Sequence, residues 1–283
     1  EIPLCDWSSD VCSSDLRSHD GKEIPLATSW LAWKHRREYL GGVVFDPSGR
    51  ERPGVFNLWR GWPIEPRPGD WSIVREHFRE VICSGNEAHF AYVMGWLRRL
   101  VQQPDRPGEV VLALRSKEEG AGKGLACTAV RRMFGQHALA VERTRSLTGQ
   151  FNAHLRDLVV LVANEAVFAG DHSSGAVLRS LICDPTMQIE QKGVDPFEVR
   201  NFLHILMTTN EDWAVPVSLK DRRFAIFDVS PRRVGDRAYF EKLGNAADDD
   251  AVIGAMLHDL LAEPLGAFQV RDIPVTAARV EQM

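Results

Sequence analysis

One segment, residues 109–134, constrains the fold more than any other part of the sequence. It reads EVVLALR, then SKEEGAGKG, and then a stretch over residues 125–134 whose apolar residues recur at helical spacing. Phosphate-binding loops have this order of apolar strand, glycine-rich turn, lysine and helix. Glycines let backbone N–H groups turn around a phosphate, and the helix dipole and the lysine favour the negative charge. The segment therefore predicts a nucleotide-binding loop, or P-loop; the alternative is a plain strand-to-helix turn.

This loop departs from the usual pattern GxxxxGK[ST] at two positions. Lys117 stands at the first glycine position, and Gly124 stands where a hydroxyl normally holds Mg²⁺. The charge facing the phosphates is expected from Lys123. The residues expected to bind the nucleotide are Gly120, Ala121, Gly122, Lys123 and Gly124.

A second apolar run, residues 158–163, ends in Asn164 and Glu165. We expect this strand beside the P-loop strand, where Glu165 can orient or deprotonate the water that attacks the γ-phosphate. The alternative is a surface glutamate at a strand end. Asn164 stands where an aspartate usually completes the magnesium shell, so the Mg²⁺ site is altered at two positions. Either Mg²⁺ is held through waters and phosphate oxygens, or hydrolysis is weak.

Two further elements follow at regular spacing. The run 203–208 leads to Asn210, whose amide can hold the lytic water between Glu165 and the γ-phosphate. Arg222 and Arg223 open the last run, and the planar fork of arginine suits the charge on a transferring phosphate. One of them can act as an arginine finger on a neighbouring subunit's nucleotide, although a single arginine is also a common salt-bridge partner. Together the four elements predict an ATPase.

The pattern around these motifs predicts an α/β fold. Short apolar runs separated by helical stretches indicate a largely buried sheet, and they cover residues 110–114, 158–163, 203–208 and 224–229. Upstream, apolar spacing predicts two amphipathic helices between residues 73 and 100, which the linker 102–108 ends. Four tryptophans among glycines and prolines predict a packed collar of turns and short strands in residues 17–70.

The order of Lys123, Glu165, Asn210 and the arginine pair resembles the superfamily three helicases, an AAA+ branch found in viral and phage replication proteins. More closely, the chain is similar to the helicase-like domain of phage primase-polymerases and poxvirus-type primase-helicases. The matching phrases are FNLWRGW (56–62), YVMGWLRRLVQQP (92–104), GAGKG (120–124), LTGQFNAHL (147–155), VANEAVFAGD (162–171), IEQKGVDPFEVRNFLHILMTTN (189–210) and KDRRFAIFDVS (220–230). They cover the chain from about residue 30 onward.

The resemblance implies a three-layer AAA+ module with an N-terminal helical collar. It implies ATP and Mg²⁺ as cofactors, hydrolysis at the interfaces of a homo-hexameric ring, and translocation on single-stranded DNA. It also implies that Lys192, beside Gly193, lies on a pore loop that grips the DNA. The local side chains, two basic against three acidic between residues 190 and 200, do not by themselves indicate a DNA groove. By analogy, a primase or polymerase domain is expected upstream.

Composition narrows the functional classes further. With 34 basic and 39 acidic residues the net charge is −5, so no overall positive field attracts DNA or an anionic membrane. Five well-separated cysteines without a CxxC pair argue against zinc clusters and disulfides. No apolar run approaches the roughly 20 residues of a membrane span. The composition therefore fits a reducing cytoplasm, and the resemblance implies a phage protein in a bacterial host.

Both ends of the chain look foreign or incomplete. Residues 6–16, DWSSDVCSSDL, are similar to a translated sequencing adapter, so residues 1–16 are expected to be a non-native leader. The expected division continues with a collar and helices over 17–108, the P-loop module over 109–230, and a C-terminal extension over 231–283 that is cut short. The chain is thus expected to be a piece of a longer protein.

Two other functions remain open from the sequence. The altered Gly124 and Asn164 positions suit a catalytically weak nucleotide-binding scaffold or DNA loader. Another P-loop motor, such as a packaging ATPase, shares the same ATPase motifs, although the expected Lys192 loop favours the helicase.

Overall fold

The computed structural model describes residues 16–17, 23–24, 26–142, 149, 151–164, 172–210 and 222–276. The chain divides into two compact units, residues 1–44 with 51–56 and residues 45–50 with 57–283. In the first unit, β1 (Leu16–Arg17) pairs with β2 (Glu23–Ile24), and α1 covers Leu26–Ala32. At its boundary, β3 (Val43–Val44) pairs with β4 (Phe56–Asn57). The rings of Tyr39 and Phe56 meet edge to face, with centroids 4.9 Å apart.

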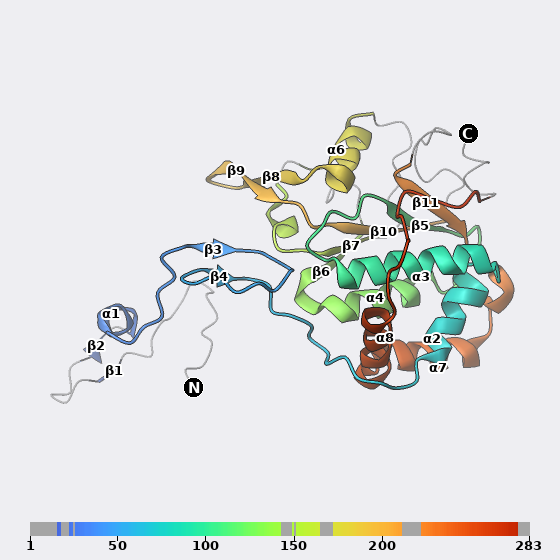
Figure 1. The fold of residues 1–283 in the computed structure, drawn as a ribbon, viewed down its shortest axis with the longest axis horizontal. Helices are drawn as coiled ribbons and strands as arrows, with labels where there is room; N and C mark the ends of the chain where they lie inside the picture. The colour runs from blue at the N-terminus through green and yellow to red at the C-terminus, as the bar shows by residue number, and fades with distance from the viewer. Residues whose placement is uncertain are drawn as a thin grey trace. The chain divides into compact units, whose positions relative to one another are not determined.

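The second unit is built on a five-stranded sheet, and its α/β class confirms the prediction from the sequence (Figure 1). The strands are β5 (Val111–Arg115), β6 (Ala138–Val141), β7 (Val160–Asn164), β10 (His204–Thr209) and β11 (Phe224–Asp228). All neighbouring strands are parallel, in the order β11-β5-β10-β7-β6. Their carboxyl ends therefore share one edge, which is where ligands bind in open parallel sheets.

The strand order corrects one expectation. The strand that ends at Asn164 does not lie beside the P-loop strand β5, because β10 lies between them. The inserted strand brings the end of β10, rather than the end of β7, directly beside the loop that follows β5. Asn210 follows β10 and is therefore the nearer of the two predicted polar residues to the P-loop in strand order.

Helices cover one face of the sheet densely (Figure 1). These elements are α2 (Ser72–Glu76), the π-helix η1 (His77–Ile82), α3 (Glu87–Gln102), α4 (Lys123–Phe134), α7 (Arg237–Asp248) and α8 (Asp250–Ala262). Leu112 and Leu114 of β5 belong to this core, together with Phe78, Trp96 and Phe134. The two amphipathic helices expected before residue 100 lie here. Residues 231–283, for which only a C-terminal extension was expected, contain the helices α7 and α8.

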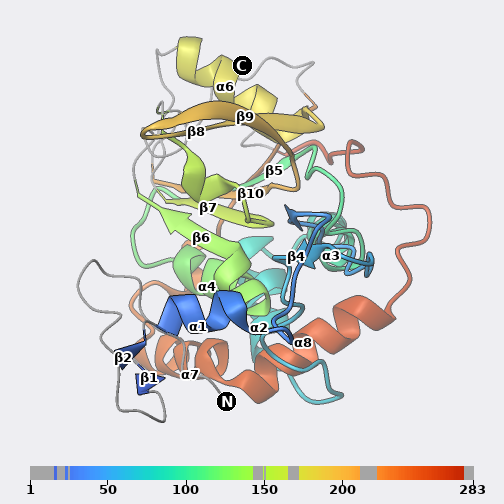
Figure 2. The same ribbon diagram turned by 90° about the vertical axis from the view of Figure 1, so that its left-hand side faces the viewer.

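A smaller core fills the other face of the sheet. It combines Val111 and Ala113 of β5 with Leu178 and Ile182 of α6 (His172–Cys183). Consecutive residues of β5 thus point to opposite cores, as a strand buried on both faces requires. A hairpin of β8 (Thr186–Gln191) and β9 (Val194–Arg200) adds Met187 and Ile189 to this core, and it lies on the same side as α6 in Figure 2.

Short 3₁₀ turns and an aromatic cluster connect these layers. The turns are η2 (Gly135–His137), η3 (Ala153–Leu155) and η4 (Pro231–Arg233). Trp59 and Trp62, from the FNLWRGW phrase, meet with ring centroids 5.5 Å apart, and Trp62 lies 5.0 Å from Phe134 of α4. These two tryptophans therefore pack in the second unit, whereas Trp30 and Trp33 of the first unit are 44% and 49% exposed.

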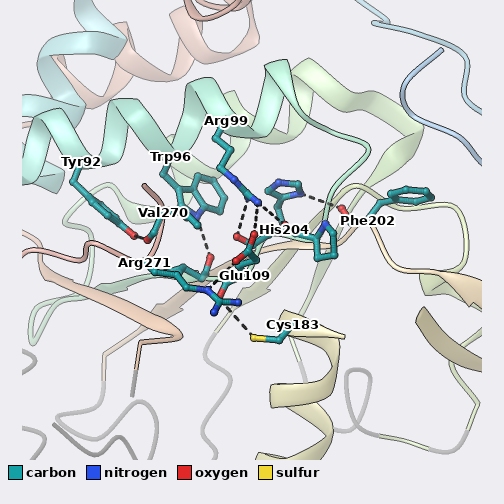
Figure 3. Close-up of polar contacts among 12 residues, drawn as sticks. Tyr92, Trp96, Arg99, Glu109, Cys183, Phe202, His204, Val270 and Arg271 are labelled. Carbon is teal, nitrogen blue, oxygen red and sulfur yellow. Dashed lines mark hydrogen bonds and ion pairs between the residues drawn. The ribbon is translucent and has the colours of Figure 1, made fainter. Parts of the chain in front are cut away.

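The edge at which the strands begin is fixed by a polar cluster around Glu109 (Figure 3). Arg99 of α3 donates to the carbonyls of Pro107 and Gly108 and to the Glu109 carboxylate, the last at 2.8 Å. Arg271, from the segment after α8, binds the other oxygen of that carboxylate, also at 2.8 Å. Glu109 adopts a φ of 63°, an uncommon conformation for a residue with a Cβ. Both guanidinium groups therefore anchor the residue from which β5, and with it the P-loop, extends.

Candidate functional site

The predicted phosphate loop joins β5 to α4, as the sequence pattern indicated. Gly120 and Gly122 adopt φ values of 72° and 93°, in the left-handed region that glycine occupies without strain. Ala121 between them is buried, and α4 begins at Lys123 with Gly122 as its N-cap. The loop thus ends at a helix N-terminus, where unpaired N–H groups and the helix dipole favour an anion.

A pocket of about 970 Å³ opens at this loop. It is lined by Glu119, Gly120, Ala121, Gly122, Lys123, Gly124, Leu125, Glu142, Asn164, Thr208, Asn210 and Phe240. All five predicted loop residues are among them, together with residues at or just after the ends of β6, β7 and β10. Because the strands are parallel, these residues meet at the carboxyl edge of the sheet, as expected for a ligand site in this architecture.

Two of the predicted residues are in direct contact inside the pocket. Lys123 Nζ donates a hydrogen bond to Asn210 Oδ1 at 2.6 Å, although 87 positions separate them in the sequence. The lysine side chain is largely buried, since only 9% of the residue is exposed. A buried ammonium group requires polar or anionic partners, so this position suits the binding of a phosphate.

A second polar pair lies at the ends of β7 and β10. Thr208 Oγ1 donates to Asn164 Oδ1 at 3.2 Å, and the two residues are direct partners in the strand register. Asn164, which stands at a usual metal-ligand position, is therefore oriented by a hydroxyl that the sequence analysis did not single out. Gly124 has no heavy atom within 4 Å of the position that a Cβ would take, so the missing hydroxyl leaves open space there.

Two pocket residues, Glu142 and Phe240, and one residue behind the loop, His77, also escaped the sequence analysis. Glu142 follows the short strand β6, which no expected apolar run covered, and Phe240 belongs to α7. His77, at the start of η1, is buried against the loop from outside the sheet, and its Nε2 lies 3.1 Å from the Gly122 carbonyl oxygen. An apolar helical pattern surrounds His77 in the sequence, and nothing there distinguishes it from a core histidine.

The arginine pair lies away from this pocket. Arg223 precedes β11, and its carbonyl accepts a hydrogen bond from Val111 N at 2.8 Å where β5 begins. Arg222 is exposed beside it. Both therefore lie at the edge where the strands begin, opposite the edge that carries the phosphate loop. Glu165 lies outside the described residues, so its expected role remains a prediction.

The predicted DNA-contacting residues lie at the tip of the β8–β9 hairpin. Lys192 and Gly193 connect the two strands, both are exposed, and Gly193 adopts a φ of 78° as a tight turn requires. Asn152 joins the hairpin to the preceding segment through three hydrogen bonds. Its backbone N–H donates to Glu190 O, its amide nitrogen donates to Gln188 O, and its amide oxygen accepts from Glu190 N at 2.8 Å. The LTGQFNAHL phrase therefore contains the residue that holds the hairpin in place.

Some other properties of the described residues narrow the chemistry. They contain no group of three or more histidine, cysteine or acidic residues arranged to hold a metal ion. Burial raises the pKa of the Cys83 and Cys127 thiols to about 12, so neither is a reactive nucleophile. No helix in these ranges is both long and apolar enough to span a bilayer.

Comparison with known proteins yields a consistent set of likenesses. The model of a family of unknown function (DUF5906) matches residues 114–223, which include the loop, Asn210 and the arginine pair. The chain is 28% identical over 141 residues to a DNA primase-polymerase of Nitratiruptor phage NrS-1, an alignment that covers 48% of this chain and 19% of that protein.

The fold is similar to solved structures as well. The apo structure of the NrS-1 C-terminal region aligns with a TM-score of 0.70 at 20% identity, covering 84% of this chain and 59% of that one. An A-form apo structure of the same region gives a TM-score of 0.71 at 19% identity, over 85% and 59%. At these identities the likeness establishes the fold. The chain spans about three fifths of the solved chains and about one fifth of the phage protein.

Proposed function

We propose that this chain is the ATP-hydrolysing motor region of a phage replication protein, of the superfamily three helicase type. The observation that carries the proposal is the contact between Lys123 and Asn210 at the N-terminus of α4. A loop lysine and a strand-end amide that meet above a helix N-terminus form a cradle for a polyphosphate and for the water that attacks it. The likeness to a phage primase-polymerase supports a role in DNA replication.

The strand order supports the same proposal. With β10 between β5 and β7, the amide of Asn210 lies beside the loop, and the end of β7 at Asn164 lies one strand further away. We propose that Asn210 orients the lytic water and that Glu165, which follows β7, accepts its proton. The pocket volume of about 970 Å³ is within the roughly 300–1,000 Å³ that small-molecule sites occupy, so it accommodates a nucleoside triphosphate.

The pocket fits Mg²⁺ only in part. Gly124 supplies no oxygen, and Asn164 Oδ1 already accepts from Thr208, so the two usual protein ligands are replaced. Among the described residues, Glu119 and Glu142 are the acidic residues that line the pocket. We propose that Mg²⁺ enters with the nucleotide, held mainly by phosphate oxygens and water, as this ion commonly is. When bound, Mg²⁺ would supply positive charge that favours the triphosphate.

We further propose that single-stranded DNA is the track of the motor. The exposed Lys192 at the hairpin tip supplies a phosphate contact, and Asn152 keeps the hairpin attached to the body of the unit. The position of Arg222 and Arg223 far from their own loop supports a role at a neighbour's nucleotide. Such a contact in trans implies a closed ring, which we propose to be a homo-hexamer. A primase or polymerase domain on another part of the full-length protein completes this proposal.

ATP turnover, measured with and without single-stranded DNA, tests the proposal. We expect measurable hydrolysis that single-stranded DNA stimulates. The alternative function is a nucleotide-binding scaffold, which the residues Gly124 and Asn164 at the usual metal-ligand positions favour. If the protein is such a scaffold, it should bind ATP without hydrolysing it, with or without single-stranded DNA. A packaging-type motor predicts stimulation by double-stranded rather than single-stranded DNA. Absence of ATP binding would exclude all three functions.

A further inference from the structure

A buried histidine connects the phosphate loop to two helices outside the sheet. His77 Nε2 lies 3.1 Å from the carbonyl oxygen of Gly122, and His77 Nδ1 lies 2.9 Å from the hydroxyl of Tyr239 on α7. A carbonyl oxygen can only accept a hydrogen bond, so Nε2 must carry a proton. In a neutral ring Nδ1 is then an acceptor, and the Tyr239 hydroxyl donates to it. The contacts therefore form a directed chain from Tyr239 through His77 to Gly122.

The neutral state of the ring follows from its surroundings. Burial lowers the pKa of His77 to about 4, against a smaller opposing effect of the Gly122 carbonyl. At neutral pH the ring is therefore uncharged, and only one of its two tautomers satisfies both partners. The Gly122 carbonyl thus selects the tautomer protonated at Nε2, and the Tyr239 hydroxyl stabilises that tautomer by donating to Nδ1.

Gly122 is the point at which the loop becomes a helix. Its φ of 93° is accessible mainly to glycine, and its carbonyl also accepts long hydrogen bonds from Leu125 N at 3.2 Å and Ala126 N at 3.3 Å. A Cβ at this position would lie 2.5 Å from Cε1 of His77 and 2.8 Å from Phe240. The imidazole therefore contacts the turn itself and also donates to its carbonyl.

We infer that His77 is a positioning residue of the phosphate loop. By donating to the Gly122 carbonyl, it keeps that oxygen turned toward η1, and the neighbouring N–H groups are left to face an anion in the pocket. His77 does not line the pocket itself, so it acts through Gly122. This inference rests on the proposed nucleotide binding for its effect on affinity, but the hydrogen-bond chain is a property of the protein without nucleotide.

Affinity for ATP in matched variants tests the inference. His77→Phe retains an aromatic ring but removes both hydrogen bonds, and we expect ATP to bind roughly threefold to tenfold more weakly, the range of one neutral hydrogen bond. His77→Gln can place an amide N–H near the former Nε2 position and should recover most of the affinity. A purely structural role would make the two variants equivalent. Unchanged affinity in folded His77→Phe would overturn the inference.

Tyr239→Phe provides a second and milder test. It removes the hydroxyl that donates to Nδ1 and stabilises the Nε2-protonated tautomer, so it should weaken ATP binding by a smaller factor and add little in the His77→Phe background. Tyr92→Phe is the matched control, because it removes a buried hydroxyl that donates to Val270 O at 2.6 Å. That control should lower the unfolding temperature without changing ATP affinity. Equal losses of affinity in both tyrosine variants would contradict the positioning role.

Nitrogen NMR of the protein without nucleotide separates this inference from the proposed function. The His77 signal, assigned by its loss in His77→Gln, should show a neutral ring protonated at Nε2 from about pH 6 to pH 8. This range surrounds the ordinary histidine pKa, at which an exposed ring would change its charge. In Tyr239→Phe that preference should weaken. A ring protonated at Nδ1 would overturn the inference even if ATP binds. If the ring is protonated at Nε2 but the protein binds no ATP, the hydrogen-bond chain through His77 is confirmed and the proposed function is refuted.

Discussion

The ammonium group of Lys123 and the amide oxygen of Asn210 are hydrogen-bonded at 2.6 Å, across the edge of two adjacent parallel strands. A phosphate that enters the pocket competes with this amide for the lysine. Exchange of the partner would free Asn210 Oδ1 to bind the attacking water. Under the proposed function, the same contact would stabilise the buried lysine before a nucleotide binds and leave a free amide afterward.

The first prediction concerns the lysine itself. Lys123→Ala removes the charge that faces the β- and γ-phosphates, so ATP should bind roughly 10- to 100-fold more weakly, as expected for hydrogen bonds to a charged group. Isothermal titration with ATP measures this change, and circular dichroism shows that the variant is folded. Lys242→Ala, on the exposed surface of α7, is the matched control and should bind ATP normally. Unchanged affinity in folded Lys123→Ala would refute the P-loop assignment.

A second prediction uses the open space at Gly124. Gly124→Thr places a hydroxyl where P-loops usually hold Mg²⁺, and no heavy atom lies within 4 Å of the new Cβ. We expect a folded variant whose ATP turnover needs less Mg²⁺ for half-maximal rate, measured by titrating the metal at fixed ATP. Gly122→Ala is the contrasting change, because φ is 93° and His77 Cε1 would lie 2.5 Å away. It should lower the unfolding temperature and weaken ATP binding. An unaltered magnesium requirement in Gly124→Thr would show that the ion is not held at this position.

The main features of the site follow from periodicity and strand ends, which is why the sequence predicted them. Lys123 and Asn210 each follow a short apolar run, and parallel strands bring their carboxyl ends to one edge whatever their separation in the sequence. Strand order is a long-range property that no local pattern contains. The sequence therefore predicted the β7 strand beside β5, whereas the structure has β10 there.

Some features that the sequence analysis missed lack a local signal, whereas others have one. His77 lies within an apolar helical pattern, and its contact with Gly122 spans 45 positions. Strand β6 is only four residues long, too short for a clear period. The helices α7 and α8 did have a signal, since Asp236 and Asp249 cap them by accepting from backbone N–H groups two or three residues later. Greater weight on capping residues would have predicted both helices from the sequence.

A third prediction concerns the catalytic base and its neighbour in a ring. Glu165→Gln preserves size but removes the base, so ATP should still bind while turnover falls roughly 10²-fold or more. Arg222→Ala or Arg223→Ala should also lose turnover while retaining DNA binding. If the two residues act on opposite sides of a subunit interface, as proposed, mixing an inactive arginine variant with Glu165→Gln should restore some activity. Absence of any recovery would argue against an arginine supplied in trans.

The fourth prediction is a loss of stability in mild acid. Burial lowers the pKa of His77 to about 4 and that of His204 to about 3, the latter also affected by the charge of Arg99. Histidines in the unfolded chain titrate near the ordinary value of about 6.5, so between these values the unfolded state binds more protons. The stability from both residues is complete above pH 6.5 (approximately) and declines as the pH falls toward their folded values. Thermal unfolding from pH 7 to pH 5 should show a falling midpoint. His77→Gln should flatten the slope.

The last prediction separates DNA gripping from ATP chemistry. Lys192 is exposed at the tip of a hairpin that Asn152 anchors, and it lies outside the residues that line the nucleotide pocket. Lys192→Ala should weaken single-stranded DNA binding and lower the slope of log affinity against log salt by about 0.7, the value for one phosphate contact on a single strand. ATP binding should remain normal.

In the proposed ring each subunit loses one contact, so unwinding should decline more than basal ATP hydrolysis. Asn152→Ala should also weaken DNA binding, because it removes the hydrogen bonds that hold the hairpin. The charge of Lys192 remains in this variant, so the salt slope should stay unchanged. Normal DNA binding and unwinding by Lys192→Ala would refute the pore-loop assignment and leave the helicase proposal to rest on the ATPase site alone.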